Sequence, residues 1–366
     1  MGISNLMDVI RDRSPDAIYQ SPISRFKGQM VAVDLSIFAH AKFREILPTF
    51  VREKEDEDGT DESGSENDED YEDEDTEPWY VDWVKLKKRW FTLFFNFAKD
   101  LIVGGVSPIF IFDGKALKIK KNEHSKREKQ RKRGEELYQI AKTNYLNTKG
   151  RFQKNEAREK CKKAFISQTR FQKDLLIELK LFFEGLSFPV LQSIEESDYL
   201  IASLSHDGII NSCLSTDTDL IIYGISFLLT ECRHGIVKIV DRKKFMDDLE
   251  VDNDKLIDLA IMLGCDYNEK VKGVGAKTGV RLLEQYNKLE LLPVKYYKKE
   301  LYRTIIRKRF SKLVPWEDVT DFSKSNVKNI DDLTFDKDKM LKSGMRAFQT
   351  VGLGDKWGDM TEDLRK

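Results

Sequence analysis

The sequence predicts an α/β protein with a mostly parallel central sheet flanked by helices. Short apolar runs of the kind that form buried strands alternate with longer segments in which apolar residues recur at helical spacing. Several of these runs end on acidic residues, and an intensely basic segment follows the second run. Strands that alternate with helices are typical of a parallel sheet, whereas consecutive strands would indicate a sandwich or barrel.

The apolar runs predict the strands. In chain order these are 30–35, 107–112, 187–192, 211–216, 226–231 and 236–241. The longer segments predict helices at 79–103, 198–204 and 253–264, and a Gly-rich turn at 273–277 opens another helix. In 79–103, Trp83, Leu86 and Trp90 follow helical spacing, which favours packing against a core over stacking on bases. Gly104-Gly105 ends that helix.

Charge is distributed unevenly along the 366 residues. The net charge is −1, but residues 51–78 hold 16 acidic residues against Arg52 and Lys54. Removing this segment of charge −14 leaves +13 on the rest of the chain. The segment is too polar to bury a core, so we expect it to be disordered. A basic body favours nucleic acid as the partner, and a basic surface with a solubilising segment is the alternative.

Other classes of protein fit the sequence poorly. No apolar stretch reaches the length of a membrane span, and the N-terminus lacks the pattern of a signal peptide. The four cysteines are scattered and show no CxxC spacing. We therefore expect no membrane partner, no disulfide framework and no zinc site, and a reducing intracellular compartment fits.

Acidic residues occur at or just beyond the ends of four predicted strands. They are Asp34, Asp113, the pair Glu196 and Asp198, and the pair Asp217 and Asp219. A single acid at a strand end often caps the next helix. Four such places at the edge where α/β sheets bind ligands favour a site for Mg²⁺ or Mn²⁺ instead. Two such ions can hydrolyse a phosphodiester, and Asp266, at a helix end, is a seventh candidate ligand.

At these residues the chain resembles the flap endonuclease/XPG (Rad2-like) family of structure-specific 5′-nucleases. The resemblance rests on ordered motifs that begin with "MGISNLMDVI" and continue with "VAVDLS", "PIFIFDGK", "ESDYLIASL", "STDTDLIIYG" and "MLGCDYNEKVKGVGAKTGVRLL". The spacing between Asp113 and Glu196 is that of the flap-endonuclease branch. It implies a PIN-like sheet with a helical arch and a helix–two-turn–helix element. A large DNA virus is a possible source.

The resemblance assigns roles to individual residues. Lys120 and Arg127 fall on the basic pair that contacts the scissile phosphate, and seven residues apart on a helix they share one face. The backbone of Gly2 can approach the site closely. The metal ligands it implies, for two Mg²⁺ ions that Mn²⁺ can replace, are Asp34, Asp113, Glu196, Asp198, Asp217, Asp219 and Asp266. The DNA contacts it implies are His40, Lys126, Arg131, Gly273, Gly275 and Lys277.

Four departures from the family pattern stand out. Asp198 replaces a glutamate, which keeps the charge and shortens the reach, and His40 replaces an aromatic residue that stacks on DNA. The family holds K⁺ at the helix–two-turn–helix element, where Lys270 here replaces a hydroxyl-bearing residue. The acidic segment lies in the loop that forms the family's pocket for a 3′ flap. It is an inert loop or a DNA mimic that competes for the basic surface, and a protein-docking role is also open.

The implied organisation has five parts. They are an N-terminal nuclease region (1–50 and 79–115), the acidic insertion 51–78, a basic arch (116–165), an internal nuclease region (166–345) with the helix–two-turn–helix element at about 253–290, and a C-terminal tail (346–366). No clear sliding-clamp peptide follows residue 340, so clamp binding is not expected. We expect a monomer located in the nucleus, or at a cytoplasmic replication site for a viral chain.

The resemblance implies a 5′-flap endonuclease with 5′–3′ exonuclease activity that acts near single-strand/double-strand junctions in DNA replication, repair or recombination. Two other functions stay open. One is a Holliday-junction or gap nuclease of the same superfamily. The other is a non-catalytic DNA-binding scaffold, which the presence of all seven acids disfavours.

Overall fold

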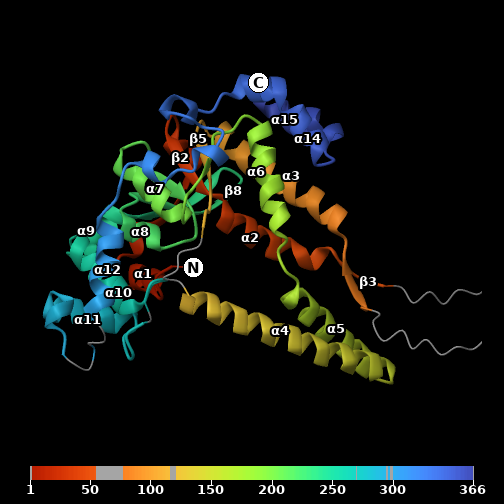
Figure 1. The fold of residues 1–366 in the computed structure, drawn as a ribbon, viewed down its shortest axis with the longest axis horizontal. Helices are drawn as coiled ribbons and strands as arrows, with labels where there is room; N and C mark the ends of the chain where they lie inside the picture. Colours follow the sequence, from red (N-terminus) through yellow and green to blue (C-terminus); the bar gives the residue numbers. More distant parts are fainter. Residues whose placement is uncertain are drawn as a thin grey trace, which may run out of the picture. The chain divides into compact units, whose positions relative to one another are not determined.

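A computed structural model of the chain describes residues 2–54, 77–115, 121–268, 270–293, 296 and 300–365 (Figure 1). They form two compact units. Unit 1 comprises residues 1–41, 91–123 and 173–366, and unit 2 comprises residues 42–90 and 124–172. Lys120 and positions 55–76 of the acidic insertion lie outside the described residues.

A seven-stranded sheet forms the centre of unit 1. Its order is β1-β9-β8-β7-β2-β5-β6. The strands are β1 (Ile18–Pro22), β2 (Met30–Asp34), β5 (Ser107–Phe112), β6 (Val190–Gln192), β7 (Ser212–Leu214), β8 (Phe227–Arg233) and β9 (Ile236–Asp241). The five strands from β8 to β6 run parallel, whereas β9 and β1 are antiparallel to their neighbours. The predicted mostly parallel sheet flanked by helices is therefore confirmed.

The central strands are buried on both faces, which explains why their sequences read as continuous apolar runs rather than alternating ones. Val31, Ala32 and Val33 of β2 are fully buried, as are Ile109, Phe110 and Ile111 of β5. The register places Ala32 beside Ile109 on one side and beside Cys213 of β7 on the other. Strands β7, β2, β5 and β6 are thus consecutive neighbours, and this order matters for the site.

Helices surround the sheet of unit 1. They are α1 (Leu6–Arg13), α6 (Lys173–Gly185), α7 (Ser197–His206), α8 (Asp219–Tyr223), α9 (Arg242–Leu249), α10 (Asn253–Leu263), α11 (Ala276–Tyr286), α12 (Glu300–Ser311), α13 (Lys337–Ser343), α14 (Met345–Thr350) and α15 (Trp357–Arg365). Phe348 of α14 and Trp357 of α15 pack on Phe95, with ring centroids 4.7 and 6.3 Å away. The predicted C-terminal tail thus contributes two packed helices.

Three helices run through both units: α2 (Leu35–Ile46), α3 (Trp83–Val103) and α4 (Lys121–Asn147). Within unit 2, α4 lies beside α5 (Arg151–Gln168), and the two are joined where Gly150 adopts a positive φ of 97°. Tyr138 and Phe165 hold the pair together with ring centroids 5.6 Å apart. The predicted basic helical segment is therefore a helical hairpin with a small apolar contact.

A two-stranded ribbon in unit 2 corrects the predicted extent of disorder. Strand β3 (Val51–Glu53) pairs antiparallel with β4 (Trp79–Val81), and Glu53 lies opposite Trp79. Both strands flank the acidic insertion, and β3 falls inside the segment 51–78 that was predicted to be disordered. The composition of the segment did not indicate β3, because a strand of three residues is too short to change the average of a long acidic stretch.

Other boundaries also differ from the prediction. Strand β6 begins at Val190 rather than at residue 187, because positive φ at Ser187 (61°) continues the turn after α6. Strand β1 was not predicted at all. Among the described residues, no helix combines the length and apolar character that crossing a membrane requires.

Candidate functional site

The sheet order brings four acid-bearing strand ends together. Strands β7, β2, β5 and β6 are parallel neighbours, so their carboxyl ends lie along one edge of the sheet. Asp34 is the last residue of β2, and Asp113 follows β5 directly. Glu196 and Asp198 lie where the chain passes from β6 into α7, and Asp217 and Asp219 where it passes from β7 into α8. The predicted convergence at this edge is what the topology provides.

Asp34 is the most enclosed of these acids. Its side chain is buried and accepts hydrogen bonds from the hydroxyls of Ser215, at 2.9 Å, and Ser197, at 3.3 Å. Burial, together with Asp113 and Asp217, raises the pKa of Asp34 to about 8, although the Ser215 hydroxyl opposes the shift. Two hydroxyl donors from two different loops therefore fix the orientation of this carboxylate.

The loop after β5 is tied to the loop after β6. The Asp113 carboxylate accepts a hydrogen bond from the backbone N–H of Ser197 at 2.9 Å. The backbone N–H of Gly114 donates to the carbonyl of Glu195 at 2.5 Å. A side chain at Gly114 would collide with the backbone, because its Cβ would lie 2.1 Å from the Ser193 carbonyl oxygen. This close approach holds Asp113 beside the start of α7.

The N-terminus packs against the pair of aspartates. Gly2 adopts a positive φ of 92°, and a Cβ at that position would lie 2.3 Å from Oδ1 of Asp217 and 2.6 Å from Oγ1 of Thr218. The backbone N–H of Ile3 donates to Oγ1 of Thr218 at 2.9 Å. Oδ1 of Asp217 also accepts from the backbone N–H of Asp219 at 2.9 Å. Gly2 thus packs directly against Asp217, one of the predicted ligands.

Glu196 and the loop after α10 meet at Tyr267. The hydroxyl of Tyr267 donates to Oε2 of Glu196 at 3.0 Å and lies 3.1 Å from the hydroxyl of Tyr223. Burial raises the pKa of Tyr267, and Tyr223, Glu196 and Asp219 raise it further. Asp266 precedes Tyr267 and is half-buried. Its loop therefore reaches the edge that carries the other acids.

Mutual repulsion marks Asp198 as part of the same cluster. Burial raises its pKa well above the ordinary value, and Asp217, Asp34, Asp219 and Asp113 each raise it further. Buried carboxylates at this density are unfavourable unless protons or cations offset their charge. All these donors are carboxylate oxygens, which Mg²⁺ and Mn²⁺ prefer. Donor chemistry and electrostatics therefore fit divalent cations. Within the described ranges, no three His, Cys, Asp or Glu side chains are arranged to hold one ion as they stand.

The remaining predicted residues occupy two other places. His40 is exposed on α2. On α4, Arg127 is half-buried and Arg131 is exposed. Lys126 lies on α4 as well, and Lys120 lies outside the described residues. The predicted pairing of Lys120 with Arg127 at the scissile phosphate stays a prediction.

The predicted helix–two-turn–helix element falls on α10, α11 and the loop between them. Gly273 has a positive φ of 80°, and Gly275 is the N-cap of α11. A Cβ at either glycine would meet no atom within 4 Å, and Lys277 is exposed in the first turn. The backbone amides at this helix N-terminus are thus open to an anion such as phosphate.

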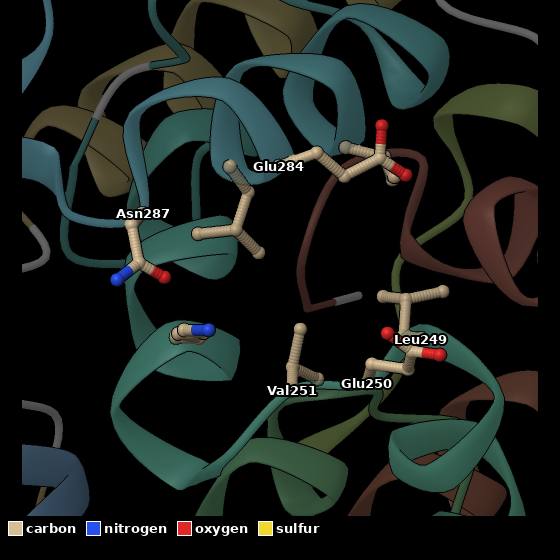
Figure 2. A pocket seen from close by; sticks show the side chains of 8 residues that line it. Leu249, Glu250, Val251, Glu284 and Asn287 are labelled. Atoms are coloured by element: carbon tan, nitrogen blue, oxygen red, sulfur yellow. The ribbon is translucent and has the colours of Figure 1, made fainter.

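A cavity of about 270 Å³ lies behind this element, between the end of α9, the start of α10 and α11 (Figure 2). One wall is formed by Val280, Leu283 and Glu284 from one face of α11, together with Asn287, which caps the end of that helix. The opposite wall includes Leu249, Glu250, Val251 and Lys255. Every residue of this lining lies apart from the predicted site residues, so the cavity is not the carboxylate edge.

Sequence reasoning missed the groups that hold the acids in place. These are the hydroxyls of Ser197 and Ser215, the hydroxyl of Tyr267, and Thr218, which anchors the N-terminus. A signal existed for the two serines, because each precedes a predicted ligand in a strand-end loop. Arg309 of α12 was also missed, and no local pattern marks it. Burial lowers the pKa of Arg309, but Tyr223, Tyr267 and Glu195 outweigh this effect and raise it.

Comparison with known proteins agrees with the arrangement of these elements. The XPG N-terminal domain matches residues 80–134, and the XPG I-region matches residues 187–266. Flap endonuclease 1 of Heterostelium pallidum is 26% identical over 295 residues, which cover 79% of this chain and 66% of that protein. Flap endonuclease 1 of Komagataella phaffii is 27% identical over 296 residues, covering 79% and 69%. Two segments of the chain therefore match XPG family models, and the chain is similar to flap endonucleases over 79% of its length.

Solved structures of the family share the fold. The catalytic core of Rad2 in complex with a DNA substrate matches with a TM-score of 0.58 at 15% identity, covering 99% of this chain and 100% of that one. Human GEN1 in complex with Holliday junction DNA matches with a TM-score of 0.57 at 17% identity, covering 99% and 77%. The chain aligns with about two thirds of the length of the flap endonucleases named above. The Rad2 and GEN1 structures match the chain equally well, so the fold alone does not indicate which DNA substrate the chain prefers.

Proposed function

We propose that this chain is a divalent-metal-dependent, structure-specific 5′-flap endonuclease with 5′–3′ exonuclease activity on DNA. One observation carries the proposal: four neighbouring parallel strands end in acids at one edge of the sheet. The charge of +13 outside residues 51–78 favours a polyanionic substrate. The matches to the XPG N-terminal and I-region models and the similarity to flap endonucleases support the same activity.

The acids that would hold two Mg²⁺ ions, or Mn²⁺ in their place, are Asp34, Asp113, Glu196, Asp198, Asp217, Asp219 and Asp266. When bound, such ions neutralise the phosphodiester and activate water for its hydrolysis. The protein's own groups prepare the edge. Ser197 and Ser215 orient Asp34, Tyr267 orients Glu196, and the missing side chain of Gly2 lets the N-terminus pack on Asp217.

Two further elements would engage DNA. The N-terminus of α11, with Gly273, Gly275 and Lys277, presents backbone amides and a cation to the backbone of the downstream duplex. Lys120 and Arg127 would contact the scissile phosphate, with His40, Lys126 and Arg131 as further contacts. A K⁺ ion near Lys270 and a nuclear location stay predictions. Binding that uses many phosphates would weaken steeply as salt rises.

A panel of four DNA substrates tests the proposal. Double-flap, single-flap, gapped and four-way DNA are digested side by side with Mg²⁺ and with EDTA. We expect cleavage near the junction of the flap substrates, only with Mg²⁺. Preferred cleavage of four-way or gapped DNA would replace the proposal with a Holliday-junction or gap nuclease. Failure to cleave any of the four would favour a non-catalytic scaffold.

Asp219→Asn supplies the matched test of the acidic edge. Asp219 is fully buried at the first position of α8, and asparagine keeps its size while removing the charge. We expect cleavage to fall by at least about 100-fold, because the cation site loses one ligand. Binding of a flap substrate should stay within about threefold, since phosphates are contacted elsewhere. Normal cleavage by this variant would refute the assignment of Asp219 to the site.

A further inference from the structure

Glu195 is an additional acid directly before Glu196, and its side chain pairs with a cation of α12. Its Oε2 accepts from Nη1 of Arg309 at 3.1 Å. The partners are 114 residues apart in sequence, so the ion pair joins the loop after β6 to α12. The Arg309 side chain is 20% exposed and that of Glu195 is 43% exposed. Arg309 is therefore the more buried partner of the ion pair, and Glu195 is the more accessible to solvent.

An aromatic group fixes Arg309 from the side of α7. Its guanidinium lies 4.0 Å from the ring centroid of Tyr199, a cation–π distance. The Tyr199 hydroxyl donates to the carbonyl of Lys312 at 2.7 Å, which ties the same ring to the end of α12. Phe310, next to Arg309, contacts Tyr223 and Tyr267 with ring centroids 4.7 and 5.8 Å away. The end of α12 thus packs beneath α7, α8 and the Tyr267 loop.

This arrangement gives the two adjacent carboxylates different hydrogen-bonding partners. Glu196 accepts from Tyr267, whereas Glu195 pairs with Arg309. An unpaired carboxylate at position 195 would be a further oxygen ligand for a hard cation, one residue from a predicted ligand. A fixed guanidinium prevents this because it is always charged and binds carboxylates in a defined plane.

We propose that Arg309 is a positioning residue that keeps Glu195 out of the cation site, so that Glu196 is the acid that serves it. This inference rests on the proposed function of the carboxylate edge. It assigns the end of α12, which lies beyond the helix–two-turn–helix element in sequence, a role in selecting the ligands. It also explains how the chain tolerates one more acid than the seven that the family resemblance assigns.

The test compares Arg309→Met, Glu195→Gln and the double variant by two measurements. One is the dissociation constant of Mn²⁺ for the DNA-free protein, from paramagnetic resonance or calorimetry. The other is the single-turnover rate on a flap substrate at saturating Mg²⁺. In Arg309→Met we expect Mn²⁺ to bind about threefold or more tightly, since a nearby cation is lost and an acid is released. We expect the cleavage rate to fall by about tenfold, because the ion is drawn toward Glu195.

Removing Glu195 as well should reverse both effects. In the double variant, Mn²⁺ affinity and cleavage rate should return to within about twofold of Glu195→Gln alone, as coupled residues are expected to behave. Arg309→Lys should fall between the unmodified protein and Arg309→Met, because it keeps the pairing charge but loses the planar guanidinium. Should Arg309→Met not fold, Arg309→Gln carries the same expectations. Unchanged Mn²⁺ affinity, or a double variant as slow as Arg309→Met, would overturn the inference.

Arg307→Met is the matched control on the same helix. Arg307 lies two residues before Arg309 and pairs with Asp258, at 2.9 Å from its Nε, and with Glu290, at 2.6 Å from its Nη1. Its loss should lower the melting temperature while Mn²⁺ affinity stays within about twofold, because the pair lies away from the acids. Mn²⁺ binding is measured without substrate. A chain that cleaves none of the flap substrates would refute the proposed function and still test Arg309.

Discussion

Replacing Gly2 by alanine probes the packing of the N-terminus on the acidic edge. At its φ of 92°, a non-glycine residue costs about 1–2 kcal/mol. The added Cβ would also lie 2.3 Å from Oδ1 of Asp217 and 2.6 Å from Oγ1 of Thr218. Neither atom can move freely, because Asp217 accepts from the Asp219 N–H and Thr218 accepts from the Ile3 N–H. Displacing either one loses a hydrogen bond worth about 1 kcal/mol.

The expected total for Gly2→Ala is therefore about 2–4 kcal/mol, taken either from stability or from the position of Asp217. We expect the single-turnover cleavage rate of a flap substrate at saturating Mg²⁺ to fall by at least about tenfold, which corresponds to 1.4 kcal/mol. Binding of the substrate should change by less than about threefold, because the clash is confined to the carboxylate edge.

Gly28→Ala is the control for backbone strain. Gly28 also has a positive φ, of 78°, but a Cβ there would meet nothing within 4 Å. Both variants should lose about 1–2 kcal/mol of stability from the backbone alone, and only Gly2→Ala should lose cleavage. If Gly2→Ala cleaves as fast as Gly28→Ala, the packing of Gly2 on Asp217 has no part in catalysis and the reasoning is wrong.

Three further predictions address charge. In EDTA, the melting temperature should fall as pH rises from about 4 to 8, because Asp34, with a pKa of about 8, keeps a proton in the folded state that it loses near pH 4 when unfolded. Added Mg²⁺ should then raise the melting temperature more at about pH 8 than at about pH 6. An equal increase at the two pH values would contradict this prediction. A double-mutant cycle of Glu53→Gln and Arg158→Met, measured by urea unfolding, should give a coupling free energy of only about 0.5–1 kcal/mol, since the Arg158 side chain is 40% exposed. A coupling free energy of zero would show that the ion pair does not stabilise the fold. Deleting residues 55–76, which carry 14 acidic and no basic residues, should tighten non-specific duplex binding at low salt if the segment mimics DNA, and unchanged affinity would leave it an inert loop.

The sheet and its acidic edge could be predicted because both follow from short-range patterns. Strands buried on two faces are continuous apolar runs, as in residues 30–34 and 107–112, and the segment after each run lies at the carboxyl edge of a parallel sheet. The placement of Asp34 and Asp113 required only that the strands be parallel neighbours. Both side chains then lie close enough to the start of α7 to accept hydrogen bonds from Ser197.

Other features depend on partners that sequence does not place. Strand β1, with its Pro22 and mixed polarity, exists because β9 supplies an antiparallel partner more than two hundred residues away. The choice of Arg309 as the partner of Glu195 is likewise a tertiary contact between α12 and the loop after β6. Intrinsic preference is too weak to indicate such pairings, since strand formation reflects packing more than local propensity.

The ribbon of β3 and β4 makes the acidic insertion replaceable. Because Glu53 lies opposite Trp79, the two ends of the inserted segment are held side by side whatever connects them. Glu53 accepts from Tyr145 of α4 and Arg158 of α5, and Glu77 from Lys142 of α4, so both flanks are anchored within unit 2. Doubling the length of a loop whose ends are already closed costs only about 0.6 kcal/mol. A fluorophore-labelled tag or a small domain could therefore be grafted between residues 54 and 77, which would turn the ribbon into an attachment point for reporting on DNA engagement.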